Sequence, residues 1–267
     1  MSATANGRKS DSDMQGRLEP GDADGAGARS PVRTGFWLQT GSQAACEIAR
    51  ISGYDLVIFD LEHGTLDPSE LDHLVLVCHL LGLKTYVRVA HADRPQIQAA
   101  LDTGASGVIL PQIRDLDHAR HVCRFAKYPP LGDRGFGFNR TMQFGAVSDA
   151  FVDRENSQRG CYAMIETRGA LEVAADIAKL PCVDGLFIGP SDLSLSRGRG
   201  VFKGSGADHD DLRKVAAAAA SAGKSFAAAA PNDDYRRKAE SMRPSFIAIA
   251  DELSAMAVGF SAIRTGS

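Results

Sequence analysis

The stretch TYVRVAHADRPQIQAALDTGASGVILP, residues 85–111, contains the unit on which the whole chain is built. It begins with the short apolar run 85–89, continues through the amphipathic segment 95–105, and ends in a second apolar run, 107–111. A nearly continuous apolar run of this length is typical of a strand that is buried on both faces of a parallel sheet. Gly104 stands where the end of a helix needs a left-handed residue, as do Gly82 and Gly223 after two other helical patterns of the chain. The stretch therefore predicts a strand, a helix and a second, parallel strand.

The same unit repeats from about residue 34 onward. Eight β–α repeats within about 230 residues predict an α/β fold of the closed (β/α)8 TIM barrel type with eight parallel strands, and a doubly wound open sheet is the alternative. The predicted strands are 35–39, 55–60, 85–89, 107–111, 161–166, 185–189, 225–230 and 246–250. The helical patterns between them lie at 71–82, 95–105, 116–128, 168–180, 211–223 and 233–242.

Two segments differ from this repeat. Residues 1–33 are rich in Gly, Ser, Asp and Arg and hold almost no aliphatic side chains. We therefore expect a disordered polar tail, without the apolar segment of a secretory signal, ahead of a barrel domain at 34–267. Residues 131–160 are too long for a plain connection in a compact domain, and we expect a loop there, since such loops are often functional.

The composition argues against several classes of protein. A net charge of −3 gives no sign of a face for nucleic acid or an anionic membrane. No apolar run approaches the roughly 18 residues of a membrane span, so we expect a cytoplasmic protein. The five cysteines show no C-x-x-C pair, which argues against a disulfide framework or a zinc site and favours buried, reduced thiols. They are Cys46, Cys78, Cys123, Cys161 and Cys182.

Two carboxylates follow neighbouring strands of the predicted barrel. In such barrels the reacting groups come from the carboxyl ends of the strands. Glu166 and Asp192 stand at two of these ends, so we expect both to face one opening. An oxygen-only donor pair suits a hard divalent cation such as Mg²⁺ or Mn²⁺. The alternative is that each residue caps the helix or turn that follows it.

An arginine and a histidine are the next candidates. Arg88 lies in an otherwise apolar strand, where a guanidinium is costly to bury unless it faces an anion. That anion is either an oxygen of the substrate or an acidic residue of a neighbouring strand. His63 follows Asp60 by three residues and lies beside Glu62, and a carboxylate at one ring nitrogen would leave the other nitrogen as a base. A solvent-facing loop histidine is the alternative.

Several segments, taken in order, resemble a known family. GFWLQTGS, YDLVIFDLEHG, VRVAHADRPQIQAALDTGASGVILPQI, YPPLGDRGFGF, MIETRGAL and VDGLFIGPSDLS are similar to the 4-hydroxy-2-oxoheptanedioate / 2-dehydro-3-deoxyglucarate aldolase family, class II pyruvate aldolases of the pyruvate/phosphoenolpyruvate barrel superfamily. The resemblance covers roughly residues 34–264. It implies a metal-dependent enzyme that makes or breaks a carbon–carbon bond between pyruvate, as its enolate, and an aldehyde, with Mg²⁺, Mn²⁺ or Co²⁺ as cofactor.

The resemblance also implies roles for the residues already singled out. Glu166 and Asp192 match the metal ligands of the family. Arg88 matches the arginine that holds the pyruvyl keto oxygen as it becomes an enolate. His63, oriented by Asp60, matches the histidine that is linked to proton transfer.

Further positions are implied around the substrate. Backbone amides near Ser191 match the group that holds the pyruvate carboxylate, Trp37 lines the pocket floor, and Ala229 lies where a bulkier aliphatic residue often lines the acceptor pocket. Gln112, at the end of the fourth predicted strand, is a further candidate for substrate binding. Asp102 matches an aspartate that reaches a neighbouring subunit's site. The family's hexamers, with the last helix exchanged between subunits, imply a homo-oligomer.

Some positions depart from the family pattern. Met164 replaces a common glutamine, and the segment 249–252 lacks the glycine that usually precedes the last helix. These departures leave the substrate open more than the reaction class. Two alternatives therefore remain at this point: condensation or decarboxylation on oxaloacetate, as in siderophore-type citrate synthases, and a non-catalytic barrel.

Overall fold

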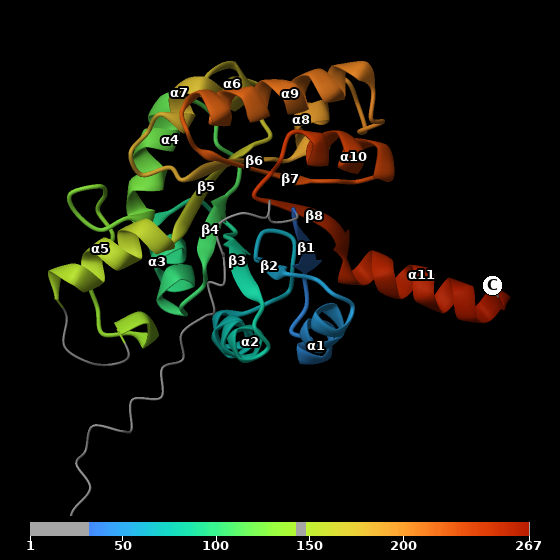
Figure 1. Ribbon diagram of the computed structural model, residues 1–267, viewed down its shortest axis with the longest axis horizontal. Helices are drawn as coiled ribbons and strands as arrows, with labels where there is room; N and C mark the ends of the chain where they lie inside the picture. The colour runs from blue at the N-terminus through green and yellow to red at the C-terminus, as the bar shows by residue number, and fades with distance from the viewer. Residues whose placement is uncertain (1–31, 143–147, 267) are drawn as a thin grey trace, which may run out of the picture. The chain divides into compact units, whose positions relative to one another are not determined.

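Eight parallel strands pair in chain order, and β8 pairs again with β1, so that the sheet closes into a barrel (Figure 1). The computed structural model describes residues 32–142 and 148–266. The predicted tail therefore lies outside the described residues, except for its last two positions. The strands are β1 Arg33–Leu38, β2 Leu56–Asp60, β3 Lys84–Arg88, β4 Gly107–Leu110, β5 Gly160–Ile165, β6 Gly185–Ile188, β7 Ser225–Ala229 and β8 Phe246–Asp251. All eight predicted strands and the predicted TIM barrel are confirmed.

Helices follow the strands and surround the barrel (Figure 1). Each segment with a helical pattern contains a helix, although the pattern at 168–180 is divided at Val173 into two short ones. The predicted left-handed glycines are confirmed at Gly82, Gly104 and Gly223, with φ of 73°, 92° and 65°. The α-helices are α1 Gln43–Ile51, α2 Pro68–Leu80, α3 Arg94–Asp102, α4 Leu116–Cys123, α5 Asp149–Gln158, α6 Arg168–Glu172, α7 Ala174–Ala178, α8 Pro190–Ser196, α9 Gly206–Ser221, α10 Asp233–Ser241 and α11 Glu252–Thr265. Two single 3₁₀ turns are η1 Arg124–Ala126 and η2 Arg140–Met142.

The prediction of a plain loop at 131–160 is wrong in part. Helix α5 occupies its second half and starts at Ser148, whose side chain accepts a hydrogen bond from the backbone N–H of Phe151. The segment DAFVDRENSQ is mostly polar, so it has no apolar period to reveal a helix. The one local sign of this helix is Ser148, because a serine just before a helix accepts a hydrogen bond from a free N–H group of the first turn.

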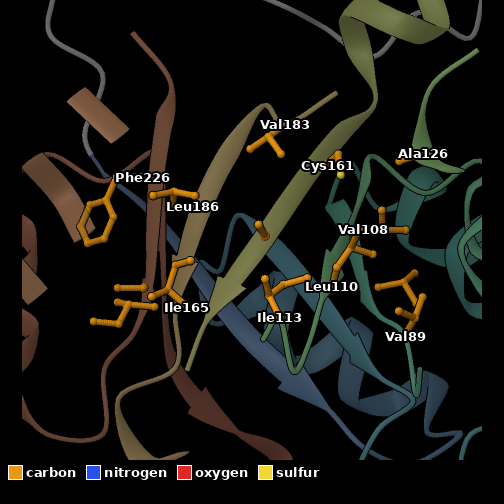
Figure 2. Close-up of a cluster of buried hydrophobic side chains, with 14 of the residues drawn as sticks. Val89, Val108, Leu110, Ile113, Ala126, Cys161, Ile165, Val183, Leu186 and Phe226 are labelled. Carbon is orange, nitrogen blue, oxygen red and sulfur yellow. The ribbon is translucent and has the colours of Figure 1, made fainter. Parts of the chain in front are cut away.

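Side chains of the strands alternate between two apolar layers. Leu56 and Ile58 of β2 point into the barrel, where they pack with residues such as Phe246, whereas Val57 and Phe59 point outward against the helices. Figure 2 shows part of the outer layer, contributed largely by β4, β5 and β6. The five cysteines are free and buried, as predicted. The barrel interior is therefore filled with side chains, and only its ends are available for a site.

Helix α11 runs away from the barrel (Figure 1) and exposes apolar side chains along its length. These are Leu253, Met256, Val258, Phe260 and Ile263. Beside its first turn, an apolar groove of about 570 Å³ is lined by residues of α1, β1 and α11, among them Ile48, Phe36 and Met256. Among the helices described, none is long and apolar enough to cross a membrane.

The inner layer makes a testable contribution to stability. Phe246 is 1% exposed and its ring lies 4.6 Å from Tyr86, 5.2 Å from Tyr162 and 5.9 Å from Phe187. We expect Phe246→Ala to lower the free energy of unfolding by about 3–5 kcal/mol, because the cavity that it leaves cannot collapse inside a closed barrel. Denaturant unfolding at one fixed protein concentration measures the change. Phe138→Ala is the control, since Phe138 is 77% exposed and its loss should change stability by only about 0.5 kcal/mol. Equal effects of the two substitutions would contradict the packing argument.

Candidate active site

A cavity of about 320 Å³ opens at the carboxyl ends of the strands. Most of the predicted site residues line it, together with several residues that were not predicted. The lining consists of Trp37, Gln39, Asp60, His63, Arg88, Met164, Gly189, Pro190, Ser191, Asp192, Ala229 and Asp251. The structure thus brings predicted residues from five different strands and their loops to one opening, as the barrel topology requires.

Arg88 and Asp60 form the central pair of this cavity. Asp60 ends β2 and Arg88 ends β3, and the two residues are direct partners in the strand register. Arg88 donates from Nε to Asp60 Oδ1 at 2.9 Å and from Nη2 to Oδ2 at 2.6 Å. Burial favours the neutral form of Asp60, but the two hydrogen bonds and the charge of Arg88 outweigh it and hold the pKa of Asp60 below its usual value. From the sequence, two partners were possible for Arg88, a substrate oxygen or an acidic residue of a neighbouring strand. Asp60 is such an acidic residue, and it binds Arg88.

The same guanidinium has contacts on its other sides. Glu62 Oε2 lies 3.2 Å from Arg88 Nη1, and the guanidinium carbon lies 4.7 Å above the centre of the Trp37 ring. A guanidinium has five N–H groups, and these contacts occupy three of them at most. One N–H on each terminal nitrogen remains for an oxygen in the cavity. Arg88 is consequently fixed in position while still able to donate to a ligand.

Glu166, directly after β5, is almost fully buried. The backbone N–H of Gln112 donates to Oε1 at 2.6 Å, whereas Oε2 is buried without a hydrogen-bond partner. Burial, reinforced by the nearby charges of Glu62 and Asp192, raises the pKa of Glu166 to about 7, although the Gln112 hydrogen bond and Arg88 oppose the shift. A buried carboxylate oxygen without a partner needs either a proton or a cation.

Asp192 stands in the first turn of α8, which follows β6. Arg88 ends β3, three strands away around the barrel. The helix begins at Gly189, which has no side chain to cap it, so its first N–H groups are left for a ligand. A Cβ atom at Gly189 would lie 2.9 Å from Glu166 Oε2, so glycine keeps the space beside that unpaired oxygen open.

A divalent cation fits this arrangement of Glu166 and Asp192. Both donors are carboxylates, one of which has an unpaired oxygen, and hard cations prefer such ligands. Within 32–142 and 148–266, no group of three or more His, Cys, Asp or Glu side chains could hold a metal ion by itself. A cation at the two carboxylates would therefore take further oxygen ligands from substrate or water, as an open catalytic site does.

The expected contact between the carboxylate of Asp60 and the His63 ring is not found. Asp60 Oδ1 accepts the backbone N–H groups of Glu62 and His63 at 3.1 and 3.2 Å, and Arg88 takes the rest of the carboxylate. The ring instead lies near the carboxylate of Glu62, whose Oε2 is 3.9 Å from Nε2. The prediction that Asp60 orients the ring is wrong because the stronger, bidentate pair with Arg88 uses Asp60. The His63 side chain itself is 58% exposed at the cavity.

Three predicted residues do not line the cavity. Glu166 is buried next to the lining residue Gly189. Gln112 has an exposed side chain and a left-handed backbone (φ 53°), and it reaches the site only through its N–H bond to Glu166. Asp102 ends α3 and does not line the cavity. Its Oδ1 accepts hydrogen bonds from Arg134 Nη2 at 2.7 Å and from Asn139 Nδ2 at 2.9 Å.

Sequence reasoning missed Gln39 and Asp251 as parts of the cavity. Gln39 directly follows β1 and Asp251 ends β8, so both satisfy the rule that strand ends supply the site. The contact of Glu62 with Arg88 was also missed. In the sequence Glu62 lies beside His63, and Arg88 lies on the next strand. Applying the strand-end rule to all eight strands would have found the first two.

Known proteins are similar to this chain over most of its length. The sequence signature described as HpcH/HpaI aldolase/citrate lyase matches residues 33–245. A 2-dehydro-3,6-dideoxy-6-sulfogluconate aldolase of Pseudomonas putida is 34% identical over 167 residues, which are 62% of this chain and 65% of the relative. A 2-keto-3-deoxy-L-rhamnonate aldolase of Klebsiella pneumoniae is 32% identical over 189 residues, 70% of this chain and 69% of the relative. The matched part thus spans about two thirds of these relatives.

Solved structures show the same fold. An HpcH/HpaI aldolase from Desulfitobacterium hafniense superposes with a TM-score of 0.81 at 28% identity, covering 88% of this chain and 92% of the other. The citrate synthase SbnG superposes with a TM-score of 0.79, covering 88% and 93%, but its 24% identity speaks for the fold alone. Together, the matched signature and the aldolase relatives show that the chain belongs to the HpcH/HpaI aldolase/citrate lyase family of carbon–carbon lyases.

Proposed function

We propose that this protein is a divalent-metal-dependent aldolase that joins pyruvate to an aldehyde, or cleaves the corresponding 4-hydroxy-2-oxo acid. The observation that carries the proposal is Arg88, fixed by Asp60 and Glu62 with two N–H groups left over, in a cavity that Asp192 also lines. Buried Glu166 lies next to this lining, since a Cβ atom at Gly189 would be 2.9 Å from its Oε2. Family membership and the names of the aldolase relatives support the reaction class.

Residues of two strand ends would bind pyruvate. Glu166 and Asp192 would hold the cation, Mg²⁺, Mn²⁺ or Co²⁺. The uncapped N–H groups near Ser191 would bind the carboxylate of pyruvate, because the start of a helix favours anions. When bound, the cation acts as a Lewis acid that draws electrons from the keto oxygen and so makes the methyl protons of pyruvate more acidic.

Arg88 and His63 would carry out the remaining tasks. As a methyl proton leaves, negative charge grows on the keto oxygen, and the free N–H groups of Arg88 would donate to it. Because Arg88 is already held by Asp60 and Trp37, little reorganisation is needed when this charge appears. His63 lies at the exposed edge of the cavity, where it would move the proton between substrate and solvent.

We also propose that the enzyme works as a homo-oligomer, a hexamer by family resemblance. The exposed apolar side chains of α11 and the uncovered groove beside α1 support an exchange of this helix between subunits. Asp102 would then serve a neighbour's cavity, which agrees with its absence from the lining of its own. Arg134 and Asn139 both bind Oδ1 of Asp102 and would hold it in place.

The first functional prediction tests the donor half-reaction without an acceptor. The enzyme should exchange the methyl protons of pyruvate for deuterium in D₂O, and a chelator should stop the exchange until Mg²⁺, Mn²⁺ or Co²⁺ is restored. Asp192→Ala should abolish the exchange, and Arg88→Ala should slow it by about 10²–10³, the usual effect of losing one oxyanion donor. Proton NMR follows the methyl signal. Arg120→Ala, at an exposed arginine of α4, is the control. Exchange without metal, or trapping of pyruvate on a lysine by borohydride, would disprove the mechanism.

A second prediction follows from the pKa of Glu166. Because this pKa is raised to about 7, the protonated form dominates below that pH in the metal-free protein. A metal ligand must be deprotonated, so Mn²⁺ affinity should rise about tenfold per pH unit below about 7 and level off above it. Calorimetric titration of chelator-treated protein between pH 5.5 and 8.5 measures this. Glu172→Gln, on the exposed face of α6, should keep the profile, whereas Glu166→Gln should lose the binding. A flat profile below pH 7 would contradict the assignment.

A third prediction concerns the shared site. Asp102→Asn and Arg88→Ala should each be poorly active alone. Subunit-exchanged mixtures should regain activity, because some cavities then combine an intact Arg88 with an intact Asp102 from the neighbour. Differently tagged variants, co-expressed and purified through both tags, provide these mixtures. If purified hetero-oligomers are no more active than the separate variants, Asp102 does not act across subunits.

A further inference from the structure

The charge of the cavity lining restricts the second substrate. We propose that the acceptor is an uncharged, hydroxylated aldehyde and that the cavity excludes aldehydes carrying a carboxylate, phosphate or sulfonate group. This inference rests on the proposed function, which assigns pyruvate to one side of the cavity and leaves the other side to the aldehyde.

The lining divides along the barrel into two parts. The donor side holds Arg88, Ser191 and Asp192, with Glu166 beneath them. Apart from Asp60, His63, Met164, Gly189 and Pro190, the remaining lining comes from neighbouring strands, β7, β8 and β1, and consists of Ala229, Asp251, Trp37 and Gln39. We call these four residues the acceptor side. A molecule bound between Arg88 and Asp192 can extend toward them.

The acceptor side carries an unbalanced negative charge. Asp251 lines the cavity and forms no ion pair with any described residue. Arg88 is the lining residue with a permanent positive charge among those described, and it is already paired with Asp60 at 2.6 Å and Glu62 at 3.2 Å. A divalent cation adds two positive charges, but Glu166 and Asp192 balance them. Within the lining that one protomer provides, no permanent cation is therefore left over for an anionic acceptor.

Helix α11 begins at the acceptor side, and the start of a helix can attract anions. Here that site is already occupied by the protein's own carboxylates. Asp251 Oδ1 accepts the backbone N–H of Ser254 at 2.8 Å, and buried Glu252 follows immediately in the first turn. Their charges offset the positive end of the helix dipole, so it gives an anionic acceptor no compensation.

The same residues suit a neutral, polar acceptor. The Gln39 amide and the Asp251 carboxylate offer hydrogen-bond donors and acceptors for hydroxyl groups, while Ala229 leaves room beside them. The ring of Trp37 provides an apolar surface for the carbon chain. Hydroxyl groups can satisfy these polar side chains without adding charge, whereas a plain alkyl chain would leave them unpaired.

The test compares acceptors that differ in charge but share a skeleton. The values of kcat/KM with saturating pyruvate are measured for butanal against succinic semialdehyde, and for glyceraldehyde against glyceraldehyde 3-phosphate. Each anionic aldehyde should react on the order of ten- to a hundredfold less efficiently than its neutral partner, because like charges a few ångströms apart repel. Glyceraldehyde should also be preferred to butanal.

One variant identifies the source of the selectivity. Asp251→Asn removes the charge but can still cap α11, and it should raise the ratio of anionic to neutral kcat/KM roughly tenfold. Asp115→Asn is the matched control, since Asp115 caps α4 in the same way and does not line the cavity, so the ratio should stay at its wild-type value.

Failure of the inference differs from failure of the proposed function. If pyruvate exchanges its protons but anionic aldehydes react as well as neutral ones, the charge selectivity is wrong and the aldolase proposal stands. A selectivity that Asp251→Asn does not change, or a preference for butanal over glyceraldehyde, would also overturn the inference. If pyruvate shows no metal-dependent exchange, the proposed function itself fails.

Discussion

The pairing of Arg88 with Asp60 is the constraint on which the site depends. A guanidinium inside a barrel end loses most of its hydration, so it requires a carboxylate partner with good geometry. Direct register between β2 and β3 supplies that partner from the backbone, without a flexible loop. The consequences extend outward: Asp60 is no longer available to His63, Glu62 is drawn toward Arg88, and Trp37 packs against the guanidinium. The charge of Arg88 also favours the carboxylate form of Glu166, but it does not outweigh burial, which raises the pKa of Glu166 to about 7.

The periodic parts of this architecture could be predicted from the sequence. Short runs such as GVILP, rich in β-branched residues and bounded by Gly and Pro, are typical of a strand buried on both faces, and the structure places β4 at Gly107–Leu110. Glu166, Asp192 and Arg88 were identifiable because polar residues at the carboxyl ends of buried strands have few structural reasons to be there. The cavity lining confirms that Arg88 and Asp192 share one opening, with Glu166 bonded beneath it to Gln112.

The features that the sequence analysis missed depend on which residues lie close together in the folded chain, and sequence spacing does not show this. Helix α5 has too few apolar residues for a period, and its cap at Ser148 is a single short-range contact. The choice of Asp60 between His63 and Arg88 depends on competing hydrogen bonds, and sequence spacing favoured the nearer residue, although Arg88 lies 28 positions away. The charge balance of the acceptor side likewise requires knowing that the ends of β1, β7 and β8 border one cavity.

Closure of the barrel also affects how the chain folds. Strand β1 finds its second partner only in β8, so Arg33 must wait for Phe246 to be synthesised before that edge can pair. During translation an apolar strand edge therefore remains open, and such an edge can pair with other nascent chains. Long sequence separation between contacting strands also slows folding in general. The order of synthesis thus leaves one edge of this sheet open until its eighth strand is available.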